Sequence, residues 1–303
     1  MYGLRYSVGG LRQSTPAVVL VHGIASSTAN WDFTPAWSVA RSLARAGYTV
    51  ISYDQLGFAR SPYHRVNGGR RLTAHTEQVM LHQVVHQVRT GTYTTTTAGG
   101  CADPARRTRS TLASPRVVLV GHSYGAGLVE GYEGIYRDAA AVVQSDLGLA
   151  SRPTPPAHPV LGPPPARNYF AFFPKGRAQC EAFNFYRPGA QPGLARIACN
   201  PAAFVLSPTG IFRDFGTTFT AATYQAIDRG GPAPHLITYG DHDVLGPANE
   251  HRDFLYWKTH CHCVVSEYVQ PASGHLFMAH RSLTQWLNVV VGWLVRHGLT
   301  PTT

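Results

Sequence analysis

A serine suited to nucleophilic chemistry lies at Ser123, within the pentapeptide GHSYG at residues 121–125. The pentapeptide fits the pattern G-x-S-x-G, in which the serine occupies a tight turn between a buried strand and a helix. The apolar run Val117–Val120 precedes it, and a run that favours a helix begins at Ala126. Such a turn pushes the hydroxyl clear of the sheet, and N–H groups at the helix start can face developing negative charge. The sequence therefore predicts that Ser123 is a nucleophile.

An acid and a histidine follow two later apolar runs, each of which is predicted to be a strand. Asp243 follows the run His235–Tyr239, and His275 follows the run Val264–Val269. Together with Ser123 they give the chain order Ser, Asp, His. That order is one of those in which a catalytic triad is known to occur.

A further loop could supply donors for an oxyanion. It begins at His22, directly after the predicted strand Ala17–Val21. In an acyl-transfer enzyme, an N–H of this loop can face the N–H that follows the nucleophile, and the two donors hold the oxyanion. We assign these backbone groups to Ile24 and Tyr124. We interpret His22 as a structural histidine that bonds the loop, and Asp54 as a turn residue that bonds the local backbone.

Taken together, these motifs closely resemble the α/β-hydrolase superfamily, in its serine esterase or lipase-like branch with a cap insertion. The resemblance extends from about Ala17 to Gly298. It implies an α/β fold with a mostly parallel central sheet flanked by helices. The motifs that carry it are His22-Gly23, Gly121–Gly125, Gly240–Asp243 and Ser273–His275.

The resemblance also implies a role for each residue. Ser123 attacks an acyl carbon, His275 takes its proton and returns it to the leaving group, and Asp243 orients the imidazole and stabilises its positive form. Asp146 is an alternative acid, because some members of the superfamily place the acid after the preceding strand. A serine nucleophile argues against the haloalkane dehalogenase and epoxide hydrolase branches, which use aspartate.

The chain divides into a core in two parts and an inserted cap. We predict the first part of the core at residues 1–149, the cap at 150–234 and the second part of the core at 235–303. The cap would lie between the strand that ends near Asp146 and the strand that starts near His235. Its composition differs from that of the core, with prolines crowded in the first residues and aromatic residues after them.

The aromatic residues of the predicted cap run from Tyr169 to Tyr186. We expect most of them to form a small core of the cap and some to line an apolar substrate pocket. Cys180 and Cys199 both fall within the cap, and a disulfide between them is expected because a small lid has little core to hold it.

Composition limits the other classes of function. The chain has 303 residues, a formal charge of +10 and five cysteines. Its arginines are scattered and lack interleaved aromatic residues, which argues against a nucleic-acid site. No run is long and apolar enough to span a bilayer, and no signal peptide is expected because Met1 leads almost directly into a predicted strand.

No metal or organic cofactor is expected. His82 and His86 are spaced i, i+4 on a predicted helix, but no glutamate completes a zinc-protease pattern. The alternating run His260–Cys263 lacks the distant second set of ligands that zinc sites have.

The sequence thus favours a hydrolase that cleaves a carboxylic ester or lactone of an apolar or aromatic small molecule through an acyl-enzyme on Ser123. Two alternatives stay open: a carbon–carbon hydrolase or hydroxynitrile lyase on the same triad, and a small-molecule receptor with this fold. Few lysines, many prolines and the expected disulfide favour secretion, whereas the missing signal peptide and the odd number of cysteines favour the cytoplasm.

Overall fold

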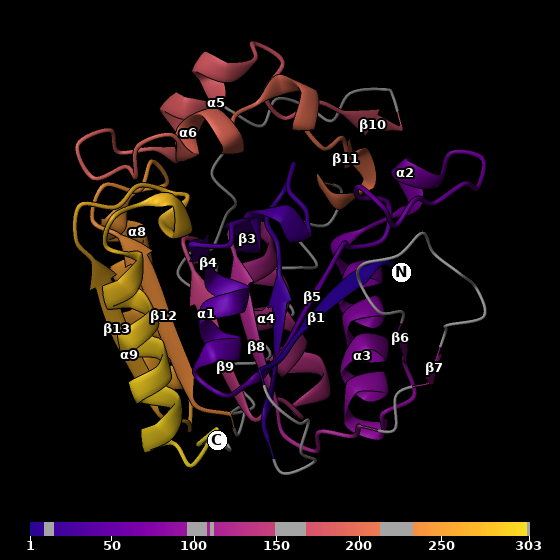
Figure 1. Cartoon of the computed structure of the whole chain (residues 1–303), viewed down its shortest axis with the longest axis vertical. Helices are drawn as coiled ribbons and strands as arrows, with labels where there is room; N and C mark the ends of the chain where they lie inside the picture. Colours follow the sequence, from indigo (N-terminus) through magenta and orange to yellow (C-terminus); the bar gives the residue numbers. More distant parts are fainter. Residues whose placement is uncertain (9–14, 96–107, 110–111, 149–167, 213–232, 302–303) are drawn as a thin grey trace.

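A twisted central sheet organises the chain (Figure 1). The computed structural model describes residues 1–8, 15–95, 108–109, 112–148, 168–212 and 233–301. In this part of the chain, seven strands form one sheet in the order β1-β5-β2-β8-β9-β12-β13. Their bounds are β1 Gly3–Tyr6, β5 Thr49–Tyr53, β2 Ala17–Val21, β8 Val117–His122, β9 Ala141–Ser145, β12 His235–Gly240 and β13 Val265–Gln270.

Only the first strand of this sheet runs against the others. β1 pairs antiparallel with β5, and every other neighbouring pair is parallel. The central strands β2, β8 and β9 are buried along their whole length, which explains why apolar residues dominate them. The predicted mostly parallel sheet is therefore confirmed.

Helices cover both faces of the sheet. On one face lie α1 (Val39–Arg45) and α9 (Leu283–Arg296), and on the other lie α3 (Ala74–Thr90) and α4 (Tyr124–Tyr136), with α8 (Pro247–His260) beside α4. Alternate side chains of each strand point to opposite faces. Val18 and Leu20 of β2 accordingly pack against the first pair of helices, and Val19 and Val21 pack against the second pair.

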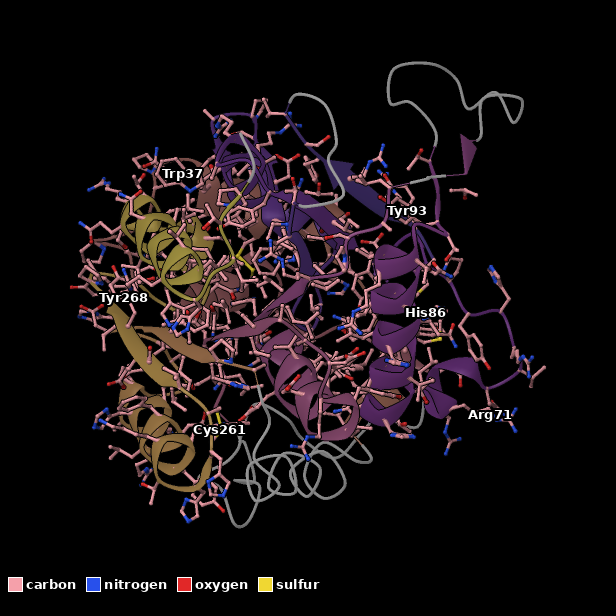
Figure 2. The ribbon with its side chains drawn as sticks, turned by 90° about the horizontal axis from the view of Figure 1, so that it is seen from below. Trp37, Arg71, His86, Tyr93, Cys261 and Tyr268 are labelled. Atoms are coloured by element: carbon pink, nitrogen blue, oxygen red, sulfur yellow. A yellow bond between two sulfur atoms is a disulfide. The ribbon has the colours of Figure 1, made fainter. Side chains whose placement is uncertain are left out.

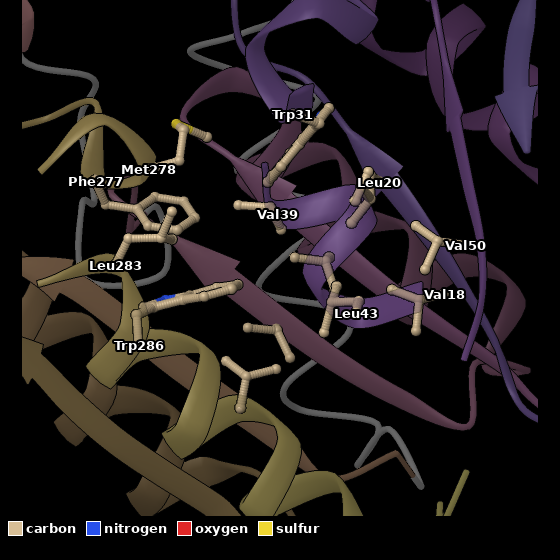
Figure 3. Close-up of a cluster of buried hydrophobic side chains, with 14 of the residues drawn as sticks. Val18, Leu20, Trp31, Val39, Leu43, Val50, Phe277, Met278, Leu283 and Trp286 are labelled. Carbon is tan, nitrogen blue, oxygen red and sulfur yellow. The ribbon is translucent and has the colours of Figure 1, made fainter. Parts of the chain in front are cut away.

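Figure 3 shows how the first face is closed by segments far apart in sequence. Trp286 of α9 is fully buried, and its indole N–H donates to Thr238 Oγ1 of β12 at 3.0 Å. The aromatic ring of Phe277 lies 4.4 Å from that of Trp286. The labelled side chains of this cluster are Val18, Leu20, Trp31, Val39, Leu43, Val50, Phe277, Met278, Leu283 and Trp286.

Residues 168–212 lie over the carboxyl ends of the strands (Figure 1). They contain β10 (Tyr169–Phe170), α5 (Arg177–Asn184), α6 (Leu194–Ala198) and β11 (Ser207–Pro208). We call this part the cap segment. Because residues 149–167 and 213–232 lie outside the described part of the chain, the predicted boundaries of the cap at 150 and 234 stay predictions.

Short elements complete the described structure. Trp37 and Ser38 form the strand β4, and α1 follows with the Ser38 hydroxyl as its cap. No helix in the described ranges has the length and apolar character needed to cross a membrane. The other short elements are β3 (Asp32–Thr34), β4 (Trp37–Ser38), α2 (Gly68–Arg71), β6 (Thr94–Thr95) and β7 (Thr108–Arg109).

Candidate active site

Ser123 occupies the turn between β8 and α4 in a backbone conformation that L-amino acids rarely adopt. Its φ is 53° and its ψ is −124°. The neighbouring glycines make this turn possible, because a Cβ on Gly121 would overlap the carbonyl oxygen of Gly125 and a Cβ on Gly125 would overlap that of Val21. The two glycines of the pattern G-x-S-x-G are thus positions at which another backbone segment lies too close for a side chain.

His275 reaches Ser123 from the loop after β13. Its Nε2 lies 2.9 Å from Ser123 Oγ. The imidazole is buried, with 1% of the His275 residue exposed. With Nδ1 protonated, Nε2 is free to accept the serine proton.

Asp243 lies in the loop after β12 and contacts the other ring nitrogen of His275. His275 Nδ1 lies 3.0 Å from Asp243 Oδ1 and 3.2 Å from Oδ2. The amide of Leu245 also donates to Oδ1, at 2.8 Å. Burial alone would raise the pKa of Asp243, but the charge and hydrogen bond of His275 outweigh burial and lower it. Asp243 is therefore held as a carboxylate that can stabilise an imidazolium.

Two further acids near these loops make different bonds. Asp146, the alternative acid, directly follows β9, and its Oδ1 accepts the amide of Gly240 at 2.9 Å. Asp241 accepts the amides of Ala272 and Ser273, each at 3.0 Å, and so fixes the loop that carries His275. The structure thus brings Asp243, rather than either of these two acids, to the Nδ1 atom of the histidine.

His122 supports the backbone of the catalytic histidine, a role that was not predicted from the sequence. Its Nε2 donates to the carbonyl oxygen of His275 at 2.8 Å. Burial, with a smaller contribution from the charge of His275, lowers the pKa of His122 to about 3. His122 is therefore neutral at physiological pH and ties the backbone of His275 to the nucleophile strand. Its position beside the serine in the pentapeptide was the available signal.

The two residues expected to provide oxyanion donors lie beside the serine. Tyr124 is the first residue of α4, directly after Ser123. Ile24 lines the same cavity as Ser123. The loop of Ile24 is held close to the nucleophile, because a Cβ on Gly23 would lie 3.0 Å from the Cβ of Ser123.

The structural interpretations of His22 and Asp54 are confirmed. The Nε2 of His22 accepts the amide of Gln55 at 3.1 Å, which leaves Nδ1 to donate to the carbonyl of Gly23 at 2.8 Å. Asp54 accepts the backbone amides of Thr28 at 2.8 Å and of Arg60 at 3.1 Å. Both side chains therefore hold loops around the site.

A cavity of about 170 Å³ opens above Ser123 and His275. Residues of the core line part of the cavity, and phenylalanines of the cap segment line much of the rest. Phe183 of α5 also contacts the triad directly, since its ring lies edge-on to the imidazole of His275 with centroids 4.8 Å apart. The cap residues that line the cavity include Phe172, Phe173, Phe183 and Phe204.

The cap segment is fastened to the loop that follows His275. The amide of Leu276 donates to the carbonyl of Asn184 at 2.9 Å. The ring nitrogen Nε2 of His280 accepts the amide of Tyr186 in the cap segment and the amide of Gly274 in the core, each at 3.1 Å. Within the cap segment, a disulfide joins Cys180 of α5 to Cys199, directly after α6.

Comparison with known families assigns the fold. The model of the alpha/beta hydrolase family matches residues 18–284. The chain belongs to this family. A sequence comparison with curated proteins finds no match.

Solved structures of this α/β-hydrolase fold cover nearly the whole chain. A monoacylglycerol lipase from Paleococcus ferrophilus is 18% identical, with a TM-score of 0.62 and 98% of each chain covered. A metagenome-derived lipolytic enzyme is 15% identical, with a TM-score of 0.62 and 97% of each chain covered. The thioesterase domain of the curacin biosynthetic pathway is 15% identical, with a TM-score of 0.60, 95% of this chain covered and 94% of the other.

Residues of the two other groupings noted in the sequence make contacts away from the triad of this α/β hydrolase. His82 stacks on Tyr136 with centroids 3.9 Å apart. Cys261 and Cys263, part of the alternating run considered for metal binding, form a disulfide. It follows α8 and precedes β13, so it lies at the amino end of the sheet, whereas Ser123 directly follows the carboxyl end of β8. Cys261 is labelled in Figure 2, which views the molecule from below. In the described ranges, no group of three or more His, Cys, Asp or Glu residues could hold a metal ion.

Proposed function

We propose that this α/β hydrolase cleaves a carboxylic ester or lactone through an acyl-enzyme on Ser123. The observation that carries the proposal is the buried chain of hydrogen bonds from Ser123 Oγ to His275 and from His275 to Asp243. This arrangement makes a serine hydroxyl nucleophilic at neutral pH, because the base and its orienting acid are already in place.

The reaction would proceed in two halves. Ser123 Oγ attacks the carbonyl carbon while His275 Nε2 takes its proton, and the amides of Ile24 and Tyr124 hold the oxyanion. The imidazolium then gives its proton to the leaving alcohol. Water, deprotonated by the same histidine, releases the acid and restores the serine. The printed names of the solved structures, a lipase, a lipolytic enzyme and a thioesterase domain, describe acyl-transfer chemistry and support this class of reaction.

The cavity supports a small apolar or aromatic acyl group. Its volume of about 170 Å³ is close to that of a dry cavity that admits one benzene ring. The phenylalanines of the cap segment would favour such a group by burial and by ring contacts. We therefore expect faster turnover of acetyl, butyryl or phenylacetyl esters than of long-chain esters. Two disulfides in the described chain support an oxidising compartment, and we propose secretion on that basis.

Hydrolysis of p-nitrophenyl esters of increasing acyl length tests the proposal, with wild type and Ser123→Ala assayed in parallel. We expect turnover by the wild type, a maximum at short or aryl acyl groups, and loss of turnover in the variant with unchanged circular dichroism. A variant with near-normal turnover would refute the mechanism. A wild type inactive on every ester and lactone would redirect attention to carbon–carbon chemistry or to ligand binding without turnover.

A further inference from the structure

A second carboxyl group is buried beside the triad acid. Asp146 follows β9 and is 1% exposed. It adopts a left-handed backbone conformation, with φ of 59°. Its amide donates to the carbonyl of Thr238 at 3.0 Å, and its Oδ1 accepts the amide of Gly240 at 2.9 Å. These bonds fix Asp146 between the ends of two neighbouring strands and direct its carboxyl group toward the loop of Asp243.

The remaining oxygen of Asp146 requires a proton. Oδ2 is enclosed and meets no N–H or O–H donor among the described residues. The carboxyl groups of Asp146 and Asp243 are neighbours, because Gly240 donates its amide to Asp146 and accepts the amide of Asp243 at 3.1 Å, and the negative charge of Asp243 acts on Asp146. Two ionised carboxylates would both be acceptors and would repel each other, whereas a protonated Asp146 can donate from Oδ2 to Asp243.

The surroundings decide which carboxyl group carries the proton. Asp243 faces the imidazole of His275 and accepts the amide of Leu245, both of which favour its ionised form. Asp146 accepts one amide and faces the negative charge of Asp243. Burial first, and then that charge, raise the pKa of Asp146 well above its ordinary value.

We propose that Asp146 is a positioning residue: it remains a neutral carboxylic acid and donates a hydrogen bond to Asp243, which fixes that carboxylate against His275. This inference rests on the proposed function, because it assigns Asp146 a part in the same triad. A neutral donor orients Asp243 without adding a second charge, which would otherwise repel the first in this dry environment. It also moderates the basicity of Asp243 and hence how strongly Asp243 holds the imidazolium.

Other titratable groups around the pair share its environment. Glu250 of α8 acts on Asp146, and three histidines lie within electrostatic range of Asp243. The histidines are His122 at the end of β8 and His275 and His280 in the loop after β13. None of these groups is altered by a substitution at Asp146, so the wild type and the Asp146 variants can be compared directly.

Two substitutions distinguish a neutral donor from an ionised acid. Asparagine tolerates the left-handed conformation, keeps an acceptor for Gly240 and offers an N–H to Asp243. Asp146→Asn should therefore preserve most of kcat and leave the acidic limb of the kcat/KM profile in place. Asp146→Ala removes the donor and should lower kcat about 10-fold or more with little change in KM.

The pH dependence of kcat/KM distinguishes a hydrogen-bond donor at Asp146 from a residue that is only structural. Without its donor, Asp243 becomes more basic and stabilises the imidazolium form of His275 more strongly. The acidic limb of kcat/KM, which reports the catalytic base in the free enzyme, should therefore move up by about half a pH unit in Asp146→Ala. Loss of orders of magnitude in Asp146→Asn would overturn the proposal, because it would mean that Asp146 works as a charged group. A normal rate and an unmoved limb in Asp146→Ala would also overturn it.

An infrared measurement tests the proton without any turnover. The difference spectrum of wild type minus Asp146→Asn at neutral pH should contain a C=O band of a protonated carboxyl group, since other buried acids cancel. Its absence would overturn the proposal even if Asp146→Ala failed to fold. The infrared measurement needs no substrate. A failure of the proposed ester hydrolysis can therefore be distinguished from a failure of the proposal that Asp146 is a neutral donor.

Discussion

Removal of the disulfide in the cap segment should affect both stability and turnover. The double variant Cys180→Ala/Cys199→Ala takes away the bond that joins α5 to the residue after α6. The same helix carries Phe183, whose ring contacts His275, and Asn184, whose carbonyl accepts the amide of Leu276. A loosened α5 should therefore disturb the catalytic histidine as well as the cap.

The size of the stability effect follows from chain entropy. The two cysteines are 19 residues apart, and closing a loop of that length stabilises the folded state by about 3 kcal/mol. The disulfide between Cys261 and Cys263 offers a matched control, because it closes a separation of 2 residues and lies far from Ser123. The same relation gives about 1–2 kcal/mol for the control pair.

Urea unfolding and steady-state kinetics on one ester would measure both effects. We expect a larger loss of unfolding free energy in the cap variant than in Cys261→Ala/Cys263→Ala, and a lower kcat/KM only in the cap variant. A thiol titration of the denatured, unreduced wild type should find at most one free thiol, since the two disulfides of the described residues take up four of the five cysteines. Equal losses in the two double variants, with unchanged kinetics in both, would refute the link between the cap disulfide and the active site.

Three other substitutions test separate parts of the site and the core. Asp243→Asn should lower kcat about 10⁴-fold with the fold intact, because the amide favours the wrong tautomer of His275; a loss below tenfold would show that another acid does this work. Phe183→Ala should enlarge the cavity and shift the preference toward longer acyl chains, and an unchanged chain-length profile would contradict its place in the cavity wall. Glu77 is fully buried and its Oε2 accepts the amide of Leu56, and burial raises the pKa of Glu77 from 4.5 to about 8. The folded state therefore binds more protons than the unfolded state between these pH values, so stability should fall as pH rises through this window, by up to about 5 kcal/mol. Urea unfolding at pH 5 and pH 8 should show this loss in wild type and much less of it in Glu77→Gln, and equal losses would contradict it.

The core strands could be predicted because their environment is simple. β2, β8, β9 and β12 are buried on both faces, so apolar residues dominate each of these short runs in the sequence. The turn at Ser123 could be predicted because two glycines mark positions where backbone segments come too close for any side chain. Asp243 and His275 could be located because both follow predicted strands, and parallel strands end at one edge of the sheet.

The contacts that tune the site could not be read from the sequence, because they depend on three-dimensional proximity. The proximity of Asp146 and Asp243 follows from the pairing of β9 with β12, two strands that the insertion separates in sequence. The disulfide between Cys261 and Cys263 was not predicted, because the alternating histidines made the same run resemble a metal site. The role of His122 depends on the carbonyl of His275, 153 residues further along the chain.

The fastening of the cap segment limits how a substrate can reach Ser123. His280 bonds Tyr186 of the cap segment and Gly274 of the core with one ring nitrogen, while its other nitrogen donates to the carbonyl of Leu276 at 3.0 Å. Burial lowers the pKa of His280 to about 4, so the neutral ring that accepts both amides persists at physiological pH. If α5 swung outward as a lid, it would break these bonds and displace the loop that positions the catalytic histidine. Access to the cavity is therefore expected without a movement of α5 away from the core, since the helix that walls the cavity also supports the base.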